Sequence, residues 1–246
     1  MSKMILEVCA GDLGSVRAAK AGGASRVELC SGLAEGGMTP SFGLMTEAMR
    51  CDIDVNVLIR PRPGDFVYTQ GDVDMMTLDI NMAKTLGAKG VVIGALTPDG
   101  DIDMKVCRRL LERRGDLTVT FHRAFDLVRD PLEALEQVIE LGCDRILTSG
   151  LAPTAEMGMP MLQTLHEAAA GRIKILAGGG VNPANAALII ASGGADELHA
   201  SARSLQPSAM LFRRESVSMG TPGTDEYARP ATDPALVAAI LASATL

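Results

Sequence analysis

The sequence of 246 residues has few aromatic residues and no tryptophan: two tyrosines and five phenylalanines make up 3% of it. It also lacks an excess of basic charge, because 30 acidic residues outnumber 23 lysines and arginines and give a net charge of −7. Proteins that bind nucleic acid without sequence preference need clustered Lys and Arg, and those that bind single strands add aromatic side chains on which bases stack. We therefore expect no nucleic-acid partner.

Cysteines are few and widely spaced. No two of them form a Cys-x-x-Cys pair, and their number is odd, so the sequence indicates neither a disulfide framework nor a zinc knuckle. We expect reduced thiols, as is usual inside the cell. The five positions are Cys9, Cys30, Cys51, Cys107 and Cys143.

Long hydrophobic runs are also missing. The N-terminal residues MSKMILEVCAGD contain one short apolar run, which Glu7 interrupts. Such a run is too short for a signal peptide or a membrane span. With 47% hydrophobic residues, the chain has enough apolar material for the core of an ordinary globular protein. A cytoplasmic protein without a membrane partner is the expectation.

Short apolar segments alternate with longer amphipathic ones along the whole chain. Two clear helical stretches are 72–86 and 130–141, the second starting with Asp130 as N-cap and Pro131 in the first turn. Strands are expected near 4–9, 25–30, 54–60, 89–94, 117–122, 144–148, 172–177 and 195–200.

Glycines at a regular spacing support this count of strands. Gly23, Gly87, Gly142 and Gly194 are each expected to end a helix as a left-handed C-cap just before a strand. Eight βα units in about 250 residues predict an α/β protein with a TIM (β/α)8 barrel, in one domain over 1–246. The alternative is a doubly wound open sheet. One irregular segment, about 203–232, is rich in Ser, Gly, Pro and Arg, and we expect a long loop near the barrel mouth.

Polar residues alternate with apolar ones on several expected strands. The outer face of each barrel strand packs on helices, so these polar residues should point inward. The inward set is Glu7, Cys9, Glu28, Cys30, Asn56, Arg60, Thr118, Thr120, His122, Glu197, His199 and Ser201. Since strand C-termini open on the active face of such barrels, a site should gather Cys9, Cys30, Arg60, His122 and His199. Buried glutamates need counter-charges, and the candidates are Arg60, Arg62, Arg123, His122 and His199.

Two further segments favour an anionic ligand. Gly179 and Gly180 follow the seventh strand, where exposed backbone N–H groups and a helix starting near Pro183 would cradle an anion. Tight loop geometry explains the glycines equally well. The stiff turn 60–66, with Arg60 and Arg62, would clamp a carboxylate or phosphate, or else pair with the interior glutamates.

Seven runs of the sequence closely resemble the CutC copper homeostasis family. They are LEVCAGD, GGASRVELCSGLAEGGMTPS, IRPRPGDFVY, TFHRAFD, RILTSG, ILAGGGV and ELHAS, in this order over nearly the whole chain. The resemblance implies a cytoplasmic TIM barrel that forms a homodimer or larger homo-oligomer, with a role in copper tolerance and trafficking. It also nominates Cys9 and Cys30 as Cu(I) ligands. Thiolates suit Cu(I), although a buried cysteine is as often plain core.

The barrel mouth has more polar residues than a metal site of two thiolates requires. The alternative hypothesis is an enzyme in which Glu7, Glu28, His122 and His199 supply acid/base groups. Its substrate would be a small anionic or phosphorylated molecule, held by Arg60, Arg62, Arg123, Gly179, Gly180 and Ser201. A third hypothesis is a structural ion-pair network without a ligand. Copper binding should survive His122→Ala and fail in Cys30→Ser, whereas an enzyme should show the reverse.

Overall fold

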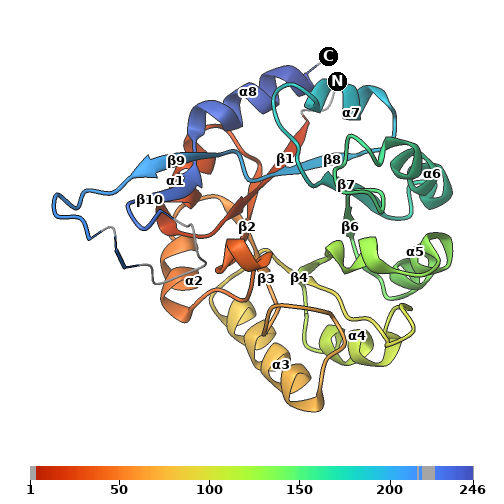
Figure 1. Ribbon diagram of the computed structural model, residues 1–246. Helices are drawn as coiled ribbons and strands as arrows, with labels where there is room; N and C mark the ends of the chain where they lie inside the picture. The colour runs from red at the N-terminus through yellow and green to blue at the C-terminus, as the bar shows by residue number, and fades with distance from the viewer. Residues whose placement is uncertain (1–3, 215, 218–224, 246) are drawn as a thin grey trace.

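The computed structural model describes residues 4–214, 216, 217 and 225–245 and shows a closed barrel of eight parallel strands inside a ring of helices (Figure 1). The barrel closes where β1 pairs with β8, Glu7 lying beside His199. The predicted TIM barrel is therefore confirmed, and the open sheet is wrong. The strands are β1 Ile5–Ala10, β2 Arg26–Leu29, β3 Asp54–Leu58, β4 Gly90–Ile93, β5 Thr118–Phe121, β6 Arg145–Thr148, β7 Lys174–Gly178 and β8 Glu197–Ala200.

Helices follow the strands and cover their outer faces. They are α1 Leu13–Ala21, α2 Phe42–Ala48, α3 Gln70–Thr85, α4 Met104–Leu111, α5 Pro131–Glu140, α6 Met159–Ala169, α7 Ala186–Ala191 and α8 Pro234–Ala244, with 3-10 turns η1 Leu33–Glu35 and η2 Arg123–Leu127. Within the described residues, none of these helices combines the length and the apolar character that crossing a membrane requires.

Local sequence signals explain most of these boundaries. Asp130 accepts hydrogen bonds from the N–H groups of Leu132 and Glu133 and starts α5, as predicted. Gly23, Gly87 and Gly142 have positive φ just before a strand, also as predicted.

The predicted left-handed C-cap at Gly194 was wrong by one residue. Gly193 has the positive φ of 74°, and Gly194 instead lies where a Cβ atom would come within 2.6 Å of the backbone of α6. Gly194 is thus required for close packing of two segments, and Gly193 for the turn. The helix expected near Pro183 begins only at Ala186, after a turn over 182–185.

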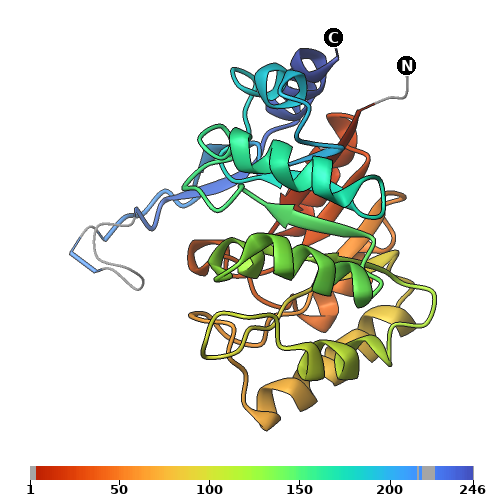
Figure 2. The same ribbon diagram turned by 90° about the vertical axis from the view of Figure 1, so that its right-hand side faces the viewer.

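The segment 203–232 is not irregular throughout. Its ends form an antiparallel pair, β9 Arg203–Pro207 and β10 Ala228–Thr232, which we call the arm together with the described residues between them. The arm is attached at its base by hydrogen bonds from Thr232 N to Ser15 Oγ (3.1 Å) and from Arg229 to Asp12 (3.1 Å). It projects away from the barrel (Figure 2). Residues 215 and 218–224 of the predicted loop lie outside the described residues.

Candidate functional site

A layer of buried charge fills the barrel beneath the mouth. Arg26 donates to Glu7 (2.5 Å) and to Glu197, and Arg145 lies 3.3 Å from Glu197. Asn56 Nδ2 donates to Glu7 Oε2 at 3.0 Å. Burial alone would raise the pKa of Glu7, but the hydrogen bond to His199 and the Arg26 charge outweigh it and lower this pKa to about 2. Glu7 is therefore a fixed negative charge.

Glycine makes room for this layer. A Cβ atom on Gly90 of β4 would lie 2.3 Å from Thr118 Oγ1 and 2.6 Å from Asn56 Oδ1. The strand can therefore carry no side chain at this inward position without displacing its neighbours.

The predicted counter-charges of the buried glutamates were partly wrong. Arg26 and Arg145 neutralise Glu7 and Glu197, together with His199, whereas Arg60, Arg62 and Arg123 make other contacts. The alternation of β2 would have found Arg26, because it shares the parity of the inward residue Glu28. The inward set predicted above began at Glu28 on this strand and so omitted Arg26.

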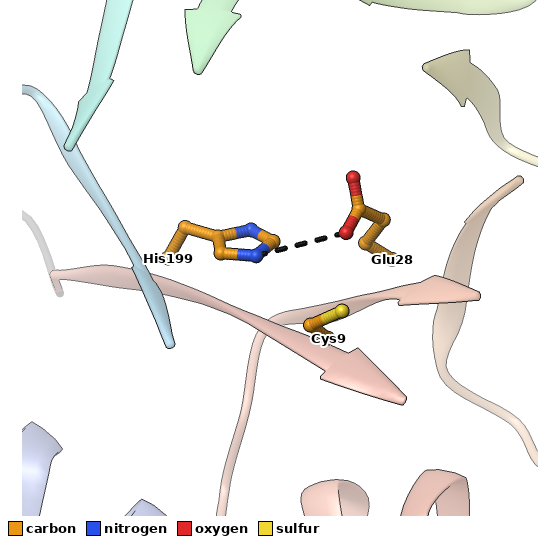
Figure 3. A group of neighbouring side chains, drawn as sticks. All are labelled: Cys9, Glu28 and His199. Atoms are coloured by element: carbon orange, nitrogen blue, oxygen red, sulfur yellow. Dashed lines mark ion pairs between the residues drawn. The ribbon is translucent and has the colours of Figure 1, made fainter. Parts of the chain in front are cut away.

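Cys9, Glu28 and His199 converge above this layer from β1, β2 and β8 (Figure 3). Their ligand atoms all lie within 4.8 Å of one another. His199 Nδ1 is 3.0 Å from Glu7 Oε1, and its Nε2 is 3.6 Å from Glu28 Oε2. Burial opposes the charged imidazole, but the charge of Glu28 and the hydrogen bonds to Cys9 and Glu7 raise the pKa of His199 well above its usual value. Burial likewise raises the pKa of Glu28, against the effect of His199.

The two predicted copper ligands do meet. Cys9 Sγ lies 3.6 Å from Cys30 Sγ, although Cys9 is level with Glu28 and Cys30 follows the end of β2. Cys30 is fully buried and Cys9 is partly exposed. The hydrogen bond with Cys30, burial and the Glu28 charge all raise the pKa of the Cys9 thiol. Cys9 is therefore a protonated thiol. The charge of Glu28 raises its pKa by more than the hydrogen bond to His199 lowers it.

Cys9, Glu28 and His199 line a cavity of about 260 Å³ at the C-terminal end of the barrel, whereas Cys30 is buried behind Cys9 and is not part of the lining. Its charged lining contains one carboxylate, Glu28, against the guanidinium groups of Arg60 and Arg123 and the imidazole of His199. The remaining lining residues are Cys9, Gly36, Leu58, Phe66, His122 and Leu147. The cavity thus combines apolar walls with a surplus of positive charge.

His122 and Arg60 are buried in one wall of this cavity. His122 Nδ1 accepts the backbone N–H of Ala124 at 3.2 Å. Arg60 donates through its terminal nitrogens to the carbonyls of Glu35, Gly37 and Gly64, each at 2.8 Å. Burial and the Arg60 charge lower the pKa of His122 to about 3. His122 is therefore neutral, with its single proton on Nε2, and suits hydrogen-bond donation better than the predicted role of base.

Arg123 lies at the rim, held by Asp126 and Ser149. Its Nε donates to Asp126 Oδ2 (2.7 Å) and its Nη2 to Ser149 Oγ (2.9 Å). A Cβ atom on Gly179 would lie 3.4 Å from the Arg123 guanidinium, so the glycine loop does reach this predicted cation. Asp126 was not anticipated, although its place in the run TFHRAFD offered a signal.

Six predicted site residues do not line the cavity: Glu7, Cys30 and Gly179, described above, and Arg62, Gly180 and Ser201. Arg62 donates to Asp65 at 3.0 Å and to the carbonyl of Val67 at 2.7 Å, and so braces its own turn. The Gly180 carbonyl accepts hydrogen bonds from Asn182 and Asn185, both at 3.0 Å. Ser201 follows β8, and its carbonyl accepts from Thr232 at the base of the arm.

Known proteins resemble this chain over most of its length. A family model described as the CutC family matches residues 4–204. A protein named as a CutC family member in Bacteroides thetaiotaomicron is 53% identical over 235 residues, 94% of each chain. The human protein named copper homeostasis protein cutC homolog is 47% identical over 231 residues, 93% of this chain and 85% of that one.

A solved structure agrees. The crystal structure of a putative copper homeostasis protein CutC from Streptococcus agalactiae has a TM-score of 0.77 and 35% identity, covering 80% of this chain and 98% of that one. The family match extends over most of the barrel and includes both cysteines, Glu28 and His199. The chain belongs to the CutC family.

Proposed function

We propose that this protein serves copper homeostasis by binding Cu(I) through the thiolates of Cys9 and Cys30. The observation that carries the proposal is the Sγ–Sγ distance of 3.6 Å. Two sulfur ligands with metal bonds of about 2.3 Å and a tetrahedral angle stand about 3.8 Å apart, so little movement is needed. Thiolates select soft Cu(I). The His199 imidazole beside Cys9 becomes a further ligand once it has lost its extra proton.

Because Cys9 is protonated at rest, the affinity for Cu(I) should depend on pH. Copper must replace the thiol proton, and the pKa of Cys9 is raised. Affinity should therefore increase as pH rises.

Anaerobic titration of the reduced protein with Cu(I) against a competing chelator tests the proposal. We expect one Cu(I) per chain, bound more tightly at higher pH, and loss of binding in the Cys9→Ser, Cys30→Ser double variant. Cys107→Ser is the matched control, because Cys107 in α4 is a thiol as fully buried as Cys30. His122→Ala should keep the metal. Equal affinity in the double variant and wild type would refute the proposal.

A second function is favoured by the cavity itself. Its positive lining and the adjacent pair of Glu28 and His199 suit acid/base chemistry on a small anion, with Arg60 and Arg123 as candidate binding groups. Glu7 would orient His199 through the 3.0 Å contact to Nδ1. Binding of a small carboxylate that persists in the cysteine double variant tests this function.

We further infer a cytoplasmic homo-oligomer. All five cysteines are free, which suits a reducing compartment. The arm exposes large apolar side chains, Leu205, Met210, Leu211 and Phe212, which a second copy would cover.

A further inference from the structure

We propose that Arg60 and His122 form a subsite for a carboxylate or carbonyl oxygen of a small organic acid. Each residue carries a buried nitrogen without a partner among the described residues: Nε of Arg60 and Nε2 of His122. Both residues line the mouth cavity, and their exposed fractions are only 6% and 5%. The inference rests on the second proposed function, binding of a small anion, and does not depend on copper.

Both nitrogens are hydrogen-bond donors. The His122 ring has its Nδ1 lone pair engaged by the Ala124 N–H, which leaves the proton on Nε2. Arg60 has only donors, and its other contacts use Nη1 and Nη2. A donor buried without an acceptor is destabilising, so two such donors in one wall indicate that an acceptor belongs there.

The surroundings hold these donors in place. Arg60 is fixed by three backbone carbonyls, and a Cβ atom on Gly94 would lie 2.4 Å from the His122 ring. Glycine at position 94 is therefore what allows the ring to lie where it does. Such preorganised donors bind an oxygen without the cost of ordering two free side chains.

Phe66 covers the subsite. Its ring centroid is 4.8 Å from that of His122 and 5.1 Å from Arg60 Cζ. Both nitrogens have almost no exposed surface in this structure, so a neighbouring group has to shift for an oxygen to reach them. We infer that this group is the Phe66 ring, because it lies close to both residues. The turn 61–67 that carries Phe66 lies outside helices and strands, so the ring can move without disturbing the barrel.

The cavity favours a small monoanion. Its volume of about 260 Å³ is below the roughly 300–1,000 Å³ of pockets that hold drug-sized ligands. Leu58, Phe66 and Leu147 provide apolar walls for a short carbon chain, and Glu28 opposes a second negative charge. A short monocarboxylate, such as a 2-oxo acid, fits this lining better than a phosphate dianion.

Nitrogen NMR of the histidine rings tests the subsite, because the chain contains only three histidines. The protein, labelled with 15N in the imidazole rings, is titrated with sodium pyruvate, with sodium phosphate and sodium chloride as comparisons, and His166→Asn identifies the exposed ring. We expect pyruvate binding to be saturable and to shift the His122 Nε2 signal, and we expect phosphate to bind more weakly.

Two variants separate a direct contact from a structural effect. His122→Phe keeps an aromatic ring without the donor and should weaken pyruvate by about 10- to 100-fold, and His122→Gln should restore part of the affinity. His166→Asn should bind as wild type. Pyruvate binding with an unmoved His122 signal and full affinity in His122→Phe would overturn the subsite alone. No saturable binding of either anion would overturn the second proposed function as well.

Discussion

Arg26 holds two carboxylates in the barrel interior, where water does not screen charge. It contacts both Glu7 and Glu197, and its side chain is only 9% exposed. Burial lowers the pKa of a guanidinium, but the charge of Glu7 and the hydrogen bond to Glu197 raise the pKa of Arg26 above its usual value. The residue is therefore an electrostatic centre of the fold as well as the support beneath His199.

Removing this charge should destabilise the protein strongly. Arg26→Met leaves two buried carboxylates without their main partner, which should lower the free energy of unfolding by about 3–5 kcal/mol. Urea denaturation followed by circular dichroism measures the change. Lys20→Met is the control, because it removes the exposed Lys20–Asp52 pair, which solvent screens, and should change the free energy of unfolding much less. Similar losses in both variants would contradict the buried network.

Asp126 links two elements, the turn η2 after β5 and the loop after β6. Its carboxylate accepts from Thr148 Oγ1 (2.5 Å) and from the backbone N–H groups of Ser149 (3.0 Å) and Leu151 (3.2 Å). It also binds Arg123 at 2.7 Å, so one side chain fixes both the loop and the rim cation of the cavity.

Asp126→Asn should loosen this junction. The amide cannot accept at both atoms, so donors of the β6 loop and Arg123 lose partners, at a cost of roughly 2–3 kcal/mol. Hydrogen exchange at the amides of Ser149 and Leu151 should accelerate more than exchange in α3. Asp101→Asn, which breaks the exposed pair with Arg129, is the comparison and should leave these amides protected. Unchanged exchange in Asp126→Asn would show that the loop is held by other contacts.

At the scale of the whole molecule, the arm is the part that the barrel does not bury. Leu211 is 99% exposed and Phe212 66% exposed, on a segment that hydrogen bonds join to the barrel near its base. An isolated chain would leave this apolar surface in water, and a second copy would remove it.

Replacing these side chains should therefore weaken self-association. We expect wild type to elute as a dimer or larger in size-exclusion chromatography with light scattering, and the Leu211→Ser, Phe212→Ser variant to shift toward the monomer at micromolar concentration. Leu78→Ser, on the exposed side of α3, is the control. A monomeric wild type would refute the homo-oligomer, and an unaltered double variant would exclude the arm from the interface.

The sequence by itself determined the barrel and the inward set of polar residues. Strand alternation is a local property of the backbone, and the periodic apolar segments leave Glu7, Cys9, Glu28 and His199 only one direction to face. Capping at Asp130 is likewise encoded within a few residues.

Only the tertiary structure decided which of these residues meet. The pairing of Glu7 with Arg26 and the approach of Cys9 to Cys30 depend on strand register and on side-chain rotamers across the barrel, which no local pattern specifies. The same holds for His122. It is neutral because it is buried beside Arg60, and the two residues become neighbours only when the barrel brings the ends of β3 and β5 together.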